Sequence, residues 1–559
     1  MSEVIQGDVD GVPTFWVDSG RPTLTGALVF RTGLVDESLP TTGWTHLLEH
    51  LGLHGRGGGA LHVNGSVSLL HTRFEAHGPT DRVAETLSAA SRWLAAPDFA
   101  ELTRERSVLR AEAALRGRGG GEVGRALLER YGARGPGLAA YEEPGLSRAT
   151  PESLRDLAHR VFVRENCALF LDGPPPVSLR LQLPSGQPTP APAAVPCGET
   201  VPAGYLIEPG ITLSGVVRRS VGATFLPHIM REGLTDEFRE RDGGAYAPWA
   251  HYEPVDDDTA LVVCGSDTSK GLLGTAVSTA VGQLDRLARG ELADDLVNDI
   301  REQLVQAATD PYSLPALAFR AAVDHLRGEP PLRLEQAVAE IESTTAEAVV
   351  AEAKAFRESL LVGVVGQATW DVDFPVVSRP PQVERMHGRG RRSRSFPADR
   401  DRLLVSQEGV QVGAAAECRT VRREAFAGLL AYPDGAREVV ADDGWSIRVE
   451  PTLWADGYQA TRELDELVPA GLHIPMPPRD HNVVPQPLTP AGQVRQVVHD
   501  VRRRPRVLLA LWGAMMAVLL VGAYAVTGRM PTPGVVGGAV VATVVALRRS
   551  KGGDGGDGE

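Results

Sequence analysis

The chain has 559 residues, of which 43% are apolar and 23% are charged. At roughly 150 residues per domain this length predicts three or four folded units, and the apolar content excludes a peptide-sized or wholly disordered protein. Asp and Glu number 71 against 57 for Lys and Arg, so the formal net charge of −14 argues against a nucleic-acid partner. The 4 cysteines form no Cys-x-x-Cys pair, which disfavours both a thiolate zinc site and a disulfide framework.

The first segment of the chain has the periodicity of alternating strands and helices. Buried-strand runs, amphipathic helical spacing and turn residues define its elements. The expected elements are a strand at 23–31, a helix at 41–54, a β-hairpin at 61–78, helices at 81–95 and 100–116, a helix from 151 and a strand at 167–171.

A second segment repeats this order of elements. Its expected elements are a strand at 213–221, a helix at 226–241, a hairpin at 245–265, helices that begin near 269, 291, 314 and 345, and a strand at 360–365. Helices that return to paired antiparallel strands predict an α+β layer. We therefore expect two tandem homologous α/β-layer domains, each an antiparallel sheet with helices.

Pro-rich stretches separate these segments from one another and from the rest of the chain. The predicted parts are a first domain at 1–173, a Pro-rich linker at 174–204, a second domain at 205–371, a basic linker at 372–401, a small β-rich domain at 402–474, a linker and juxtamembrane helix at 475–506, a transmembrane hairpin at 507–547 and a polar tail at 548–559. The basic cluster at 372–401 fits a solvated linker better than a contact with anionic lipid.

The small β-rich domain is indicated by short alternating strands broken at Pro433-Asp434-Gly435 and Asp442-Asp443-Gly444, followed by a helix at 457–467. In layout alone it resembles pleckstrin-homology-like modules. Docking to lipid or protein and a passive spacer role both fit this pattern.

The C-terminal region predicts a membrane anchor. The run 507–526 is uncharged and, as a helix, is about 30 Å long, enough to cross a bilayer. A shorter apolar run at 533–547 predicts either a return span or a buried tail. Arginines flank both runs on the outside of the hairpin, so the positive-inside rule places the preceding domains in the cytoplasm, at the cell membrane. The first residues show no signal peptide.

The candidate catalytic and metal-binding residues lie on the helix expected at 41–54, in the run His46-Leu47-Leu48-Glu49-His50. Residues four apart lie one turn above each other, so both imidazoles project from one side and can bind one metal ion, with Glu49 beside them as a base. A hydrolytic zinc site needs one more protein ligand and an open position for water. The pentapeptide alone also fits a surface helix with a chance histidine pair.

A second pattern, the run Glu105-Arg106-Ser107-Val108-Leu109-Arg110-Ala111-Glu112, favours the metal site. Together the two runs resemble the pitrilysin, insulinase and mitochondrial processing peptidase family of inverted-motif zinc peptidases, as a membrane-anchored bacterial member. The resemblance implies Zn²⁺ held by His46, His50 and Glu112, with Glu49 as the catalytic base. It also implies that Glu105 contacts one of the ligands, without binding the metal itself, and orients it or tunes its charge.

Further stretches extend the resemblance over roughly residues 10 to 370. Asn64-Gly65-Ser66 is similar to the family's edge strand, to which a peptide substrate adds as an extra strand. The run from Phe238 to Tyr246 resembles a stretch of the family's second domain, which implies that Arg239 and Tyr246 contact substrate carbonyl groups and the developing oxyanion.

Two departures from the family pattern affect the metal site. The 62 positions from His50 to Glu112 are fewer than is usual in the family, so Glu101 and Glu105 are alternative ligands. The matching helix of the second segment has His228 and Glu232 without the five-residue motif, so one metal site per chain is expected.

The implied reaction is peptide-bond hydrolysis. Family members enclose peptides between halves built from four such domains, so two domains per chain imply a dimer, either a homodimer or a heterodimer with a related subunit. Because relatives also serve as structural subunits, a catalytically silent scaffold or binding subunit at the membrane is the alternative function.

Overall fold

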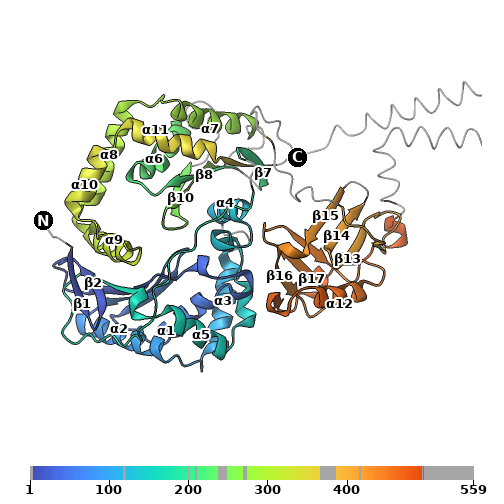
Figure 1. Cartoon of the computed structure of the whole chain (residues 1–559), viewed down its shortest axis with the longest axis horizontal. Coiled ribbons are helices and arrows are strands. Elements are labelled where there is room, and N and C mark those ends of the chain that lie inside the picture. The colour runs from blue at the N-terminus through green and yellow to red at the C-terminus, as the bar shows by residue number, and fades with distance from the viewer. Residues whose placement is uncertain are drawn as a thin grey trace, which may run out of the picture. The chain divides into compact units, whose positions relative to one another are not determined.

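The structure is a computed structural model of the whole chain (Figure 1). The described residues are 4–116, 121–198, 201–207, 210–236, 248–267, 273–365, 375, 385–414, 417–493 and 495. The predicted transmembrane hairpin at 507–547 and the polar tail at 548–559 lie outside them. Among the helices formed by described residues, none is long and apolar enough to cross a membrane.

Internal contacts divide the chain into two compact units, 1–391 with 401–485 and 392–400 with 486–559. The first unit contains both layered domains and the β-rich domain. In the second unit, the backbone N–H of Leu488 donates a hydrogen bond to Oγ of Ser395 over 2.9 Å.

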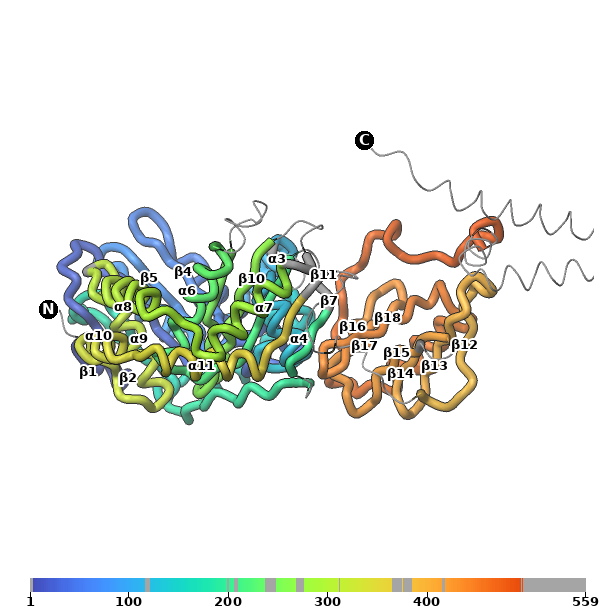
Figure 2. Tube along the Cα trace, turned by 90° about the horizontal axis from the view of Figure 1, so that it is seen from above, coloured from blue at the N-terminus to red at the C-terminus, as the bar shows by residue number. Residues whose placement is uncertain are grey.

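The first domain is built on a six-stranded sheet with the order β1-β2-β6-β3-β5-β4. Its strands are β1 (Ile5–Val9), β2 (Val12–Trp16), β3 (Leu24–Phe30), β4 (His62–Val67), β5 (Thr72–Gly78) and β6 (Cys167–Leu171). Neighbours are antiparallel except β2 and β6, which are parallel, so the sheet is mixed rather than purely antiparallel as expected. The strand β4 is at one edge, beside β5 (Figure 2).

The helices of this domain are α1 (Trp44–Leu53), α2 (Thr80–Ala95), α3 (Leu102–Arg116), α4 (Gly121–Tyr131) and α5 (Pro151–Val161). Of these, α1 and α2 lie directly against the strands β3, β4 and β5. Leu28 and Phe30 of β3 pack into a core with Leu47 and Leu51 of α1. Because apolar groups are packed on both faces, β3 and β6 are nearly continuous runs of buried residues, whereas β5 alternates between buried and half-buried positions.

The second domain repeats the layered plan. Its five-stranded sheet has the order β7-β11-β8-β10-β9. The strands are β7 (Ala203–Ile207), β8 (Ile211–Arg218), β9 (Trp249–Pro254), β10 (Thr259–Ser266) and β11 (Leu361–Val365). The helices are α6 (Val221–Asp236), α7 (Leu273–Ala288), α8 (Asp294–Thr309), α9 (Leu314–Leu326), α10 (Leu334–Ser343) and α11 (Ala346–Glu358).

The start of α6 differs from the prediction. The sequence predicted a start at 226, directly before Pro227. The helix begins at Val221 and contains Pro227 in its interior. Ala223, Leu226 and Met230 are all fully buried, so a continuous apolar stripe holds the helix together across the missing proline N–H.

The two layered domains are joined by buried polar contacts as well as by the chain. One guanidinium nitrogen of Arg130 on α4 donates to the carbonyls of Ser214 over 3.0 Å and Ser359 over 2.7 Å. Burial lowers the pKa of Arg130. Removing this side chain would leave one buried and one partly buried carbonyl without that donor, so the contact ties the first domain to the second.

The Pro-rich segment between the domains is extended but packed. Its side chains Leu179, Leu181 and Leu183 are buried in the core of the first domain. Arg31, itself only 2% exposed, donates through Nε to the carbonyl of Thr189 over 2.9 Å. The segment is therefore a strap on the first domain rather than a detached linker.

The β-rich domain has two four-stranded sheets, β12-β13-β14-β15 and β18-β17-β16-β19. Its elements are β12 (Arg391–Arg392), β13 (Arg402–Ser406), β14 (Gly409–Ala414), β15 (Glu417–Arg422), β16 (Phe426–Ala431), β17 (Arg437–Ala441), β18 (Ser446–Val449), α12 (Gly457–Leu467) and β19 (His473–Pro475). The helix has the predicted bounds, and Leu464 packs with Leu429 and Val439 in the core.

We predict that the substitution Glu253→Gln on β9 stabilises the protein at high pH and not at low pH. Burial raises the pKa of Glu253 from its ordinary value of 4.5 to about 7. The folded protein therefore keeps a proton that the unfolded chain releases, and wild-type stability falls as the pH rises through this window. The Glu253→Gln variant avoids that loss. Its Tm is expected to exceed that of wild type by about 2 to 4 °C near pH 8.5 and to match it near pH 4.5. Equal shifts at both pH values in thermal melts would contradict this assignment.

Candidate metal centre

The position of α1 is set by a carboxylate outside the helix. Gly43, in the left-handed conformation with φ 86°, precedes the helix and has no side chain to cap it. Glu37 replaces that cap, because its two oxygens accept from the N–H of Gly43 over 2.9 Å and from the N–H of Thr45 over 2.8 Å. Burial raises the pKa of Glu37 to about 7. The helix is thereby held at its first turn.

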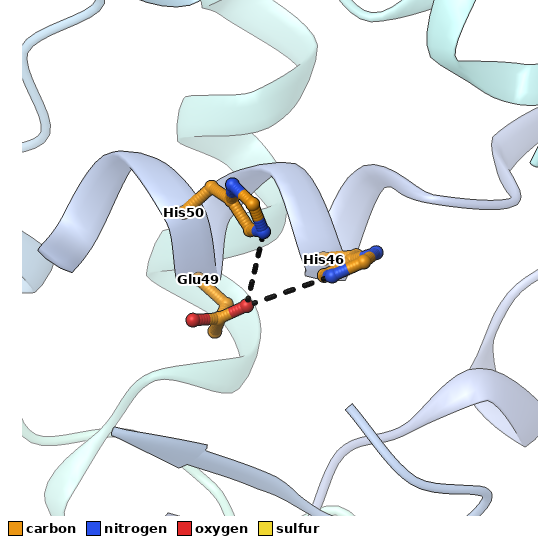
Figure 3. Close-up of side chains that lie close together, drawn as sticks. All are labelled: His46, Glu49 and His50. Atoms are coloured by element: carbon orange, nitrogen blue, oxygen red, sulfur yellow. Dashed lines mark ion pairs between the residues drawn. The ribbon is translucent and has the colours of Figure 1, made fainter. Parts of the chain in front are cut away.

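His46 and His50 lie one turn apart on α1. Their ring centroids are 4.9 Å apart. One oxygen of Glu49 lies 3.8 Å from Nε2 of His46 and 3.9 Å from Nε2 of His50 (Figure 3). Ligating atoms of the three residues fall within 4.8 Å of one another. The Nε2 atoms therefore face a common point, while Leu47 and Leu48 are buried on another side of the helix.

Each ring uses its other nitrogen to contact a carboxylate. Nδ1 of His46 lies 2.8 Å from Oε1 of Glu143, and Nδ1 of His50 lies 3.2 Å from Oε2 of Glu105. An ionised carboxylate only accepts hydrogen bonds, so it selects the tautomer in which Nδ1 carries the proton. The Nε2 lone pairs are then directed toward the shared point, as metal binding requires.

The three acidic residues that the sequence offered as the third ligand are Glu101, just before α3, and Glu105 and Glu112 on α3, and they occupy different places. Oε2 of Glu112 lies 3.8 Å from Nε2 of His50. Glu105 lies against Nδ1 of that ring instead. Glu101 lies 4.0 Å from Nε2 of His54. Of these three described residues, only Glu112 has an oxygen within 4.0 Å of an Nε2 atom of the five-residue motif.

Glu49 is buried between the helix and the edge strand. Its exposed fraction is 4%. Burial raises the pKa of Glu49 to about 7, the charge of His46 opposes this rise, and the carboxylates of Glu112, Glu105 and Glu143 add to it. A carboxyl group with a pKa near neutrality is suited to both accepting and returning a proton.

The predicted substrate strand lies beside this carboxyl group. Asn64, Gly65 and Ser66 are part of β4, which pairs with β5 on one side at the edge of the sheet. A Cβ atom at Gly65 would lie only 1.8 Å from Oε1 of Glu49, so glycine is what allows the strand to approach the helix here. Arg239 and Tyr246 lie outside the described residues.

Sequence reasoning missed two acidic residues of the site, Glu37 and Glu143. Both are on irregular segments, and Glu143 has a left-handed backbone with φ 50°. No helical spacing connects either residue to the motif. The sole signal for Glu37 was a carboxylate shortly before an expected helix start, which is a common capping arrangement.

The donor set fits a divalent cation. Two imidazole Nε2 atoms and one carboxylate are ligands that zinc prefers, and in hydrolytic sites three protein ligands leave a position for water. The hydrogen bonds from Nδ1 to Glu143 and Glu105 are of the kind that orient metal-binding imidazoles. The residues present are thus sufficient to hold Zn²⁺.

Comparisons with known proteins identify the fold. No family model matches the sequence, and no curated protein matches it. A protease from Helicobacter pylori matches with a TM-score of 0.54 at 14% identity, over 66% of this chain and 100% of that one. The peptidase M16 inactive domain from Pseudomonas fluorescens matches with a TM-score of 0.53 at 13% identity, over 66% and 99%.

A third solved structure, the first half of the periplasmic protease PqqL from Escherichia coli, matches with a TM-score of 0.50 at 15% identity, over 65% of this chain and 91% of that one. These likenesses define a class: the two layered domains have the pitrilysin-like fold of the M16 peptidases. The resemblance seen in the sequence is thereby confirmed at the level of fold.

We predict that Gly65→Ala strains the centre through Glu49. The new methyl group would overlap the carboxyl group, so Tm should fall by about 2 to 5 °C. In a Glu49→Ala background the same change should cost almost nothing, because the overlapping atoms are gone. Gly57→Ala is the matched control, since its nearest neighbour, Val63, lies 3.6 Å away. A Gly65→Ala cost that persists in the Glu49→Ala background would exclude this contact as its cause.

Proposed function

We propose that the chain is a zinc-dependent endopeptidase that cleaves peptides at the cytoplasmic face of the membrane. One observation supports this most directly: the Nε2 atoms of His46 and His50 face one point, with Glu49 between them and Glu112 3.8 Å from one ring. A chance histidine pair would have no reason to carry a buried carboxylate behind each ring. The pitrilysin-like fold agrees with the proposal.

In this proposal His46, His50 and Glu112 hold Zn²⁺. Bound there, Zn²⁺ supplies a Lewis acid that polarises the peptide carbonyl and lowers the pKa of water. Glu49 accepts the proton of the attacking water and returns one to the leaving amine. Glu105 and Glu143 keep the two rings in place. Arg239 and Tyr246 are assigned, by resemblance, to the stabilisation of the developing oxyanion.

Peptide substrates are proposed to bind along β4. An edge strand offers unpaired N–H and C=O groups, to which an extended peptide adds by main-chain hydrogen bonds. Because Gly65 contacts Glu49, a peptide bound along Asn64 to Ser66 would pass close to the base. Main-chain recognition of this kind tolerates many sequences, and alternate side chains of the peptide then set the preference.

A second copy is proposed to complete the chamber. The chain covers 91% of the first half of PqqL but only 55% of full-length PqqL, which matches with a TM-score of 0.50 at 14% identity over 78% of this chain. Two layered domains therefore correspond to about half of such an enzyme. We propose a homodimer, with a heterodimer with a related subunit as the other arrangement.

The C-terminal parts are proposed to fix the location. The apolar runs within 507–547 are assigned to a membrane hairpin that keeps the peptidase domains in the cytoplasm. The pleckstrin-homology-like layout of the β-rich domain suits docking at the same surface, and a spacer role is the alternative. The peptidase domains would then encounter peptides before those peptides are exported.

A catalytically silent scaffold is the competing function. The fold alone does not decide between an enzyme and a scaffold, because one structural match is an inactive M16 domain and another is complex III2 from Candida albicans. The complex III2 match has a TM-score of 0.55 at 14% identity, over 66% of this chain and 98% of that one. Retention of both rings, the base and their carboxylate partners favours the enzyme.

We predict that Glu49→Gln removes activity without removing the metal. The amide has the same shape but takes up no proton, so cleavage of a broad peptide library should fall by about 10²- to 10⁴-fold. Zinc content, measured by atomic absorption, should stay at that of wild type. Wild-type protein that binds zinc but cleaves no peptide in the library would favour the scaffold.

The assignment of the third ligand is tested separately. Glu112→Gln should weaken zinc binding by about 100-fold or more, because the lost carboxylate is both a ligand and a negative charge. Glu101→Gln is the matched control, since Glu101 directly precedes the same helix and its side chain is equally exposed, 45% in each case. Competition with a fluorescent chelator measures both. Equal effects of the two substitutions would rule out Glu112 as the ligand.

A further inference from the structure

His54 is a third histidine on the side of α1 that carries the metal motif. It follows His50 by four positions, as His50 follows His46, and it is the residue at which the helix ends. Its backbone has left the helical conformation, with ψ 128°. The ring is 28% exposed and lies against α3, where Nδ1 is 2.7 Å from Oε1 of Glu105.

The carboxylate of Glu105 is thus shared by two imidazoles. Oε1 contacts Nδ1 of His54 over 2.7 Å, and Oε2 contacts Nδ1 of His50 over 3.2 Å. With one ring on each oxygen, the plane of the carboxylate is fixed from both ends. Its side chain is only 9% exposed, so water offers little replacement for either partner.

The contact with His54 is the shorter of the two. If it were absent, Glu105 would be a buried carboxylate held only by the longer bond to His50. Such a group rotates toward solvent, because a buried polar group without enough hydrogen-bond partners is costly. That rotation weakens the acceptor that keeps the proton of His50 on Nδ1.

The other nitrogen of His54 has a separate role. Nε2 lies 4.0 Å from Oε2 of Glu101, which directly precedes α3. The ring therefore contacts one carboxylate just before α3 and one on it. This placement limits how far α3 can shift along α1, and α3 also carries Glu112.

We propose that His54 is a positioning residue of the metal centre, acting on His50 through Glu105. The inference rests on the proposed zinc site, but not on peptide cleavage. It assigns a role to a histidine outside the five-residue motif, and it predicts that zinc affinity depends on a side chain that never touches the metal.

The test compares two substitutions in the full-length chain. Asparagine places its amide nitrogen close to the position of Nδ1 and can donate to Glu105, whereas leucine fills similar space without a donor. His54→Leu should raise the zinc Kd by about 10- to 100-fold, and His54→Asn should stay within about 3-fold of wild type. His62→Leu, which removes an exposed histidine from β4, should leave the Kd unchanged.

A double-mutant cycle separates positioning from a merely structural role. In a Glu105→Gln background, His54→Leu should have little further effect on the zinc Kd, because the link from His54 through the Glu105 carboxylate to His50 is already lost. A His54→Leu variant with lowered metal-free Tm but wild-type zinc Kd would overturn the proposal, as would equal Kd values for Leu and Asn variants. Zinc binding by wild type without peptide cleavage would refute the proposed function and leave this inference standing.

Discussion

The candidate metal centre depends on one constraint: a carboxylate is hydrogen-bonded to Nδ1 of each imidazole, the nitrogen that faces away from the shared point. Glu143 contacts Nδ1 of His46 and Glu105 contacts Nδ1 of His50, at 2.8 and 3.2 Å. Rotation of either ring would break a charge-assisted hydrogen bond inside the protein, where water is a poor substitute. The two Nε2 atoms therefore keep their direction before any ligand arrives. Preorganisation of this kind reduces the entropy lost when a ligand binds.

The same constraint concentrates negative charge around α1. Glu112, Glu105 and Glu143 all act to raise the pKa of Glu49, and burial adds the largest effect. Mutual repulsion among carboxylates is relieved by positive charge placed between them, and a divalent ion is the most compact way to supply it. An acidic environment and two directed imidazoles thus favour the same kind of ligand. Charge alone would attract many cations, whereas the nitrogen donors favour zinc.

The sequence was sufficient for the parts that follow regular spacing and insufficient for those that depend on tertiary contacts. His46, Glu49 and His50 share a helical turn, and α1, α3 and the hairpin of β4 and β5 were expected close to their observed bounds. The strands β1 and β2 and the helices α4 and α10 were not expected, because Gly-rich or short amphipathic runs give weak periodicity. Glu143 is 97 positions from His46, and its place is determined by how an irregular segment folds back against α1. No local pattern encodes such a contact.

The rigidity of the centre also depends on the second domain. Ala27 and Val29 of β3 have their side chains on the face opposite to the core beneath α1, and there they pack with Ala318, Ala321 and Ala322 of α9. The small alanine side chains let the helix backbone approach the sheet closely. A first domain without α9 would expose an apolar sheet face, and burying such a face is a main source of domain stability. The strand β5, which pairs with the proposed substrate strand β4, also pairs with β3 in this sheet. The positions of the helix with the candidate metal motif and of the edge strand proposed for peptide binding therefore depend on both domains, because α9 of the second domain covers the other face of the sheet on which they lie.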